Sequence, residues 1–116
     1  MTHVSRAEER ITREVMSWPG VAAVTGERGE LSFRLGRREL GHLHGSRVLH
    51  IGLPKDVWRE LHAAGRIVDH PVFPGRAGFG ARALATEADV EDAVALLRLN
   101  YDRVVARHGL PEQEAA

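Results

Sequence analysis

The sequence of 116 residues contains no cysteine. Without thiols the chain can form neither a disulfide framework nor a thiolate metal site, and a cysteine nucleophile is excluded. Any metal would therefore be held by nitrogen and oxygen ligands alone. Long apolar runs are missing too, since none approaches the roughly 20 residues that cross a bilayer. Because the polar residues 1–10 open a helix rather than a signal peptide, we expect a cytoplasmic protein with no membrane partner.

An excess of charge of either sign is also absent, because 16 basic residues balance 16 acidic ones. Nucleic-acid binding usually leaves a basic surplus, so we do not expect a nucleic-acid partner. The compact basic patch at Arg34, Arg37 and Arg38 is explained at least as well by a solvated hairpin turn. The balanced charge removes one source of repulsion between copies and favours a homo-oligomer.

Neither a glycine-rich nucleotide loop nor a nucleophile elbow is present, and no internal repeat or low-complexity segment divides the chain. The length predicts a single domain over residues 1–116, large enough to bury roughly two thirds of its unfolded surface. Residues 109–116 follow the last predicted helix and are expected to fray.

Turn-bounded runs rich in β-forming residues predict strands over residues 21–25, 31–35, 38–44 and 48–53, joined as an antiparallel meander, with a further strand over residues 79–84. Helices are predicted to begin at a capping box of Ser5 and Glu8, at Pro54, and at a capping box of Thr86 and Asp89. The order α-β-β-β-β-α-β-α predicts an α+β domain. Its mainly antiparallel sheet of about five strands would be packed by the first and last helices.

Apolar stripes at helical spacing indicate which helix faces are buried. The longest and most regular stripe lies in the last helix and consists of Val90, Val94, Leu97, Tyr101 and Val104. In the central helix we expect Val57, Leu61 and Ala64 to face the sheet, and His62 to stack on Trp58.

Histidine is abundant, with seven in the chain, and His42, His44 and His50 fall within nine positions. On a strand His42 and His44 project from the same face, because side chains alternate with period two. The turn decides whether His50 joins them. A two-residue loop at residues 45–46 would turn His50 away, whereas a three-residue loop at residues 45–47 would place it opposite His42.

Two interpretations of this cluster remain open. In one, His42, His44 and His50 are the ligands of a mononuclear metal site, and Glu39 and His70 complete a ligand-binding pocket. In the other, the histidines are half-exposed strand residues with no joint task. His70 lies in a loop rich in proline and glycine, where functional side chains are often presented. Glu39 should face away from His42 on a regular strand, so it needs a bulge to join the pocket or is simply a solvated carboxylate.

The ordered run of these residues resembles the luciferase-like domain family over about residues 20–105. The resemblance rests on Glu39, His42, His44, Gly45, His50, Pro54, Gly65, the pair His70-Pro71, the pair Gly78-Phe79, and the segment Leu97-Arg98-Leu99-Asn100-Tyr101. The chain departs from the family pattern at His50, where Asp is common, and at Phe79, where Trp is usual. A fold-level similarity to YjbR-like double-wing domains is also present. Light-emitting chemistry is not transferred, and no flavin is expected, because nothing here cradles a flavin phosphate.

The sequence therefore favours a small protein whose histidine-rich pocket binds a small ligand or a metal, with a divalent transition metal as the candidate cofactor. The alternative is a non-catalytic protein- or nucleic-acid-interaction module that acts through the sheet or through the edge at Arg34, Arg37 and Arg38. The sequence does not specify a reaction, and enzymatic activity stays open.

Overall fold

The computed structural model describes residues 6–111 of the chain. It has the predicted α+β architecture, with the α-β-β-β-β-α-β-α order interrupted by one extra short strand. The elements are α1 (Ala7–Met16), β1 (Val21–Thr25), β2 (Leu31–Leu35), β3 (Arg38–His44), β4 (Val48–Gly52), α2 (Lys55–Ala63), β5 (Val68–Asp69), β6 (Phe79–Ala83) and α3 (Glu87–His108). None of these helices is long and apolar enough to span a membrane.

All strands join one six-stranded sheet in the order β1-β2-β3-β4-β6-β5, and every pairing is antiparallel. The first four strands form the predicted meander. The prediction of about five strands was one short, because β5 has only two residues, Val68 and Asp69. A segment of that length carries no periodic signal, and it is a strand only because it pairs with β6.

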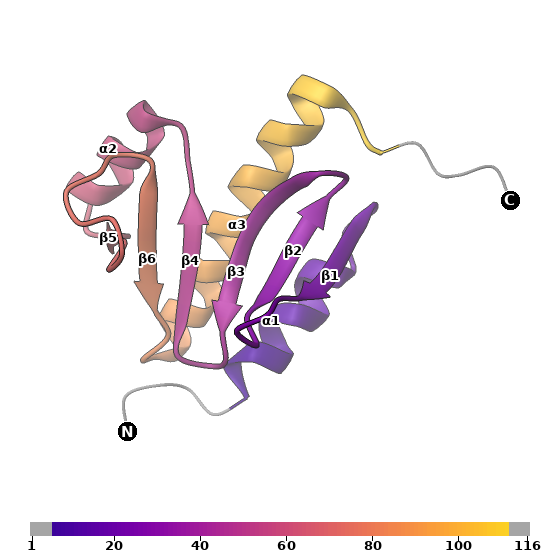
Figure 1. Ribbon diagram of the computed structural model, residues 1–116, viewed down its shortest axis with the longest axis horizontal. Helices are drawn as coiled ribbons and strands as arrows, with labels where there is room; N and C mark the ends of the chain where they lie inside the picture. Colours follow the sequence, from indigo (N-terminus) through magenta and orange to yellow (C-terminus); the bar gives the residue numbers. More distant parts are fainter. Residues whose placement is uncertain (1–5, 112–116) are drawn as a thin grey trace, which may run out of the picture.

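The helices α1 and α3 pack on one face of the sheet, which leaves the other face uncovered by helices (Figure 1). The core lies between these layers, where Ile11 of α1 and Leu97 of α3 meet Phe33, Leu43 and Leu49 of the central strands, all fully buried. Side chains therefore alternate along the central strands, with apolar residues facing the helices and polar residues on the free face.

The helix ends agree in part with the sequence. Thr86 and Asp89 form the expected capping box, and α3 ends at Gly109. Ser5 lies outside the described residues, and the first helix has Arg6 as its N-cap. Pro54 is the N-cap of α2 rather than a residue of its first turn.

The buried face of α2 agrees with the prediction at Leu61, which is buried, and at Val57, which is half-buried against the core, but it differs at two positions. Ala64 is exposed, and Trp58 is buried instead, with its indole N–H donating to the Phe79 carbonyl at 2.8 Å. His62 stacks on Trp58 as expected, with ring centroids 4.5 Å apart.

The close approach of α3 to β3 depends on a missing side chain. A Cβ atom at Gly41 would lie 2.8 Å from Cδ2 of Leu97 and 3.2 Å from the His50 carbonyl oxygen. Any larger residue would push the helix away from the sheet.

Leu97 is the central contact of this packing, so we expect Leu97→Ala to lower the free energy of unfolding by roughly 2–5 kcal/mol through lost burial and a residual cavity. Urea unfolding followed by circular dichroism measures the change. The control is Glu91→Ala on the exposed face of the same helix, which should change stability by less than about 0.5 kcal/mol. Equal effects of the two substitutions would show that the packing face is misassigned.

Candidate metal centre

A three-residue turn brings the histidines of β3 and β4 together. His44 pairs with Val48, and His42 pairs with His50, so residues 45–47 form the loop. Gly45 opens this loop with a φ of 59°, a left-handed conformation that favours glycine. Of the two registers that the sequence left open, the chain adopts the one in which all three imidazoles project from the free face.

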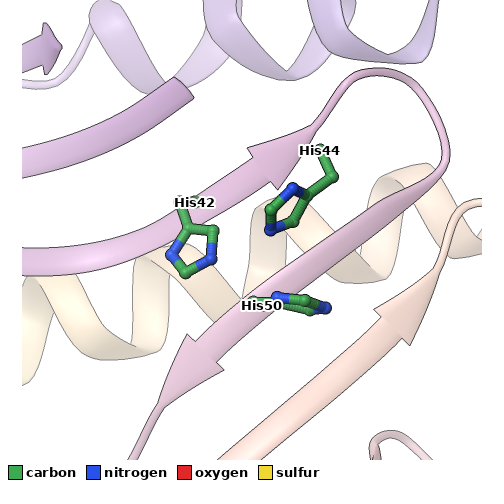
Figure 2. Close-up of side chains that lie close together, drawn as sticks. All are labelled: His42, His44 and His50. Carbon is green, nitrogen blue, oxygen red and sulfur yellow. The ribbon is translucent and has the colours of Figure 1, made fainter. Parts of the chain in front are cut away.

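The three rings converge in the space above β3 and β4 (Figure 2). Their centroids are 5.0 Å apart for His42 and His44, 5.2 Å for His42 and His50, and 4.5 Å for His44 and His50. One nitrogen atom from each ring lies within 4.8 Å of the other two. His50 is buried at 8% exposure, whereas His42 and His44 are half-buried.

A β-bulge in β3 places Glu39 beside this cluster. Phe33 pairs with Gly41 but Arg34 pairs with Glu39, so Leu40 is an extra residue in the ladder. The bulge reverses the expected parity and puts Glu39 on the same face as His42. Oε1 of Glu39 lies 3.2 Å from Nδ1 of His42.

Two polar side chains support this arrangement from outside β3. The Ser32 hydroxyl donates to Oε1 of Glu39 at 2.7 Å. On the opposite face, the buried Asn100 amide of α3 donates to the carbonyl of Leu40 at 3.0 Å and to that of Gly52 at 2.7 Å. Both carbonyls lie beyond His42 and His50, the last pair of β3 and β4, so Asn100 links these two strands where their pairing ends.

His70 reaches the cluster from the loop between β5 and β6. Its ring centroid lies 4.1 Å from that of His50. The backbone N–H of Val72 donates to Nδ1 of His70 at 3.1 Å, which leaves Nε2 as the protonated nitrogen of the neutral ring. His70 therefore packs against His50 without belonging to the group of three converging nitrogens.

Burial and mutual repulsion keep several of these rings neutral. Burial and the neighbouring His70, His44 and His42 lower the pKa of His50 from 6.5 to about 4. Burial also lowers the pKa of His44 and of His70, with His42 contributing to both shifts. For Glu39, burial raises the pKa, but hydrogen bonds from His42 and Ser32 outweigh it and the net pKa is lowered. The site thus combines neutral imidazoles at His44, His50 and His70 with an ionised carboxylate at Glu39, which are protonation states that metal ligation favours.

The cluster forms one wall of a cavity of about 630 Å³ on the free face. All five residues expected in the pocket, Glu39, His42, His44, His50 and His70, line it. Sequence reasoning missed other lining residues, among them Val24, Arg28, Glu30, Ser32, Arg34 and Phe73. The alternation of β2 could have identified Ser32 and Arg34, since it already placed Leu31, Phe33 and Leu35 on the buried face.

The structure separates the residues of the predicted basic patch. Arg34 lines the cavity, whereas Arg37 and Arg38 are exposed at the hairpin between β2 and β3.

The fold and site define an α+β domain that carries a histidine cluster on the free face of an antiparallel sheet. The profile of the Luciferase domain family matches residues 37–100, more than half of the chain, and the protein belongs to this family. The matched segment contains Glu39 and the clustered histidines and ends at Asn100. No curated protein matched the sequence, and no solved structure matched it.

The low pKa of His50 predicts acid sensitivity of the metal-free fold. Its pKa is about 4 when folded and 6.5 when unfolded, so stability is lost as the pH falls from 6.5 toward 4. When the pH is lowered from about 7.5 to 5, protonation of His50 in the unfolded state alone should lower the free energy of unfolding by about 2 kcal/mol. Urea unfolding with a chelator present measures it, and His50→Gln should flatten the dependence. Parallel pH profiles for the two proteins would contradict the assignment.

Proposed function

We propose that this protein binds a divalent transition metal through His42, His44 and His50, and that the metal holds a small ligand in the adjoining cavity. The observation that carries the proposal is the convergence of three imidazole nitrogens within 4.8 Å of one another, from two adjacent strands. In a tetrahedral zinc site the ligand atoms lie roughly 3.3 Å apart, so modest ring rotations would complete the coordination.

The donor set suits metals such as zinc, nickel, copper or iron, because imidazole is a good ligand for each of them. Three protein ligands leave at least one coordination position for water or another small molecule. A metal in such a site can polarise a bound oxygen or lower the pKa of a bound water. The proposed function is therefore a binding site that can also support metal-assisted chemistry.

The surroundings of His42 support a ligand role over a solvated one. Metal-bound histidines commonly donate their second ring nitrogen to a carboxylate, which fixes the tautomer and the ring orientation. Glu39 occupies that place at Nδ1 of His42, and Ser32 in turn holds Glu39. This leaves Nε2 of His42 free to bind a metal. Half-exposed histidines with no joint task would not need a bulge to bring a carboxylate to them.

The test is a titration of the protein, purified without a histidine tag, with Co²⁺ and Zn²⁺. We expect one equivalent of Co²⁺ to produce visible absorption bands that Zn²⁺ abolishes. His44→Ala should weaken the affinity by at least about 100-fold, because it removes a ligand. The control is His62→Ala, which removes a histidine that pairs with Asp69 away from the cluster.

A wild-type protein that binds neither metal would end the proposal. Equal losses of metal affinity in His44→Ala and His62→Ala would show that the metal is bound elsewhere. Elemental analysis of the untreated protein identifies the metal it carries after purification.

Glu39→Gln tests the supporting carboxylate separately. The amide has nearly the same shape but no charge, so we expect Zn²⁺ affinity to fall by about 10- to 100-fold while the fold is retained. Competition with a chromophoric chelator measures the dissociation constant. Glu27→Gln is the matched control, since Glu27 also lines the cavity but makes no hydrogen bond with a histidine in the described structure. An unchanged Zn²⁺ affinity in Glu39→Gln would show that the carboxylate does not support metal binding.

A further inference from the structure

The cavity is much larger than a metal site requires. Its volume of about 630 Å³ lies within the range of small-molecule pockets, about 300–1,000 Å³, whereas a metal-bound water needs only about 30 Å³. The remaining space adjoins β2, where Arg34 lies two residues along the strand from Ser32 and on the same face. The histidine cluster accounts for one part of the cavity only.

The side chain of Arg34 lines this space and contains a buried nitrogen that has no hydrogen-bond partner. Its Nε atom is buried and has no hydrogen-bond partner, and it is the one such side-chain atom among residues 6–111. Glu39 is its neighbour across the ladder, and Oε1 of Glu39 is engaged with His42 and Ser32, but within residues 6–111 no ion pair joins Arg34 and Glu39. A buried donor without a partner is costly, and a planar guanidinium pairs best with a planar carboxylate.

The charged groups and the exposed apolar side chains of the cavity wall indicate which class of ligand fits. The wall carries three carboxylates and two guanidiniums, Glu27, Glu30, Glu39, Arg28 and Arg34, and its small excess of negative charge disfavours a phosphate dianion more strongly than a singly charged anion. Large apolar side chains are exposed at six described positions, and three of these, Val24, Val72 and Phe73, line this cavity. Apolar walls with a few convergent polar groups are typical of sites for small organic molecules.

We propose that Arg34 binds the carboxylate of a small organic monoanion whose apolar body lies in the cavity beside the histidine cluster. The inference rests on the proposed function, because it names the class of molecule that the metal would meet. The contact between Arg34 and the carboxylate does not itself require the metal, so the two proposals can fail separately.

Benzoate is the probe, with benzamide as its neutral counterpart and inorganic phosphate as the competing anion. Two-dimensional ¹H–¹⁵N spectra of the wild-type protein follow the Arg34 Nε–H signal during each titration, with and without Zn²⁺. We expect benzoate to shift this signal, and benzamide to bind at least about tenfold more weakly. Arg34→Gln should weaken benzoate by at least about tenfold and leave Zn²⁺ affinity within about threefold, because Arg34 is not a metal ligand.

Two further variants test whether the effect on benzoate binding is specific to the Arg34 guanidinium. Arg37→Gln removes an exposed guanidinium on the same hairpin and should leave benzoate affinity unchanged. Arg34→Lys keeps the charge but not the planar fork, and it should bind benzoate with intermediate affinity. Thermal unfolding of each variant confirms that it is folded.

The proposal is overturned if benzoate leaves the Arg34 signal unmoved, if Arg34→Gln binds benzoate as well as the wild type does, or if phosphate binds more tightly than benzoate. If the wild-type protein binds benzoate but does not bind Zn²⁺, the result would contradict the proposed metal site alone. If it binds Zn²⁺ but does not respond to benzoate, the result would contradict the Arg34 proposal alone.

Discussion

The site depends on one irregularity in the sheet, the bulge at Leu40 in β3. A regular strand would send Glu39 to the helix side, where a charged carboxylate would be buried among apolar residues. The bulge carries Glu39 to the free face, and Asn100 of α3 binds the carbonyl of the bulged residue from behind. The last helix therefore contacts the bulged residue that precedes the site histidines and follows Glu39.

The division between the two faces explains how one small domain accommodates both a core and a polar cavity. Helices α1 and α3 cover one face, and fully buried side chains such as Leu43 and Leu49 fill the space beneath them. The same strands present His42, His44 and His50 on the other face, so the residues that stabilise the fold alternate with those that form the site. The rigid sheet holds the imidazoles close together, and their burial keeps His50 neutral.

Much of the fold was predictable because it rests on local patterns. The capping box at Thr86 is present as predicted, and four of the five predicted stripe residues of α3 are buried, whereas Val94 is half-buried. The shared face of His42 and His44 followed from strand periodicity, but the place of His50 depended on a single residue of turn length that no local rule decides. The bulge at Leu40 and the two-residue β5 depend on pairing with a neighbouring strand, which the local pattern does not specify. The alternation of β2 places Ser32 and Arg34 on the polar face, but only the assembled sheet shows that this face lines the cavity.

The turn and the sheet register bring together the three histidines of the proposed metal site. The most direct measurement is a crystal structure of the zinc-loaded protein, with anomalous diffraction recorded on both sides of the zinc absorption edge. We expect a single anomalous peak bonded to one nitrogen each of His42, His44 and His50, at about 2.0–2.1 Å. A zinc ion bound elsewhere, or a fully loaded crystal in which these three rings contact no metal, would contradict it.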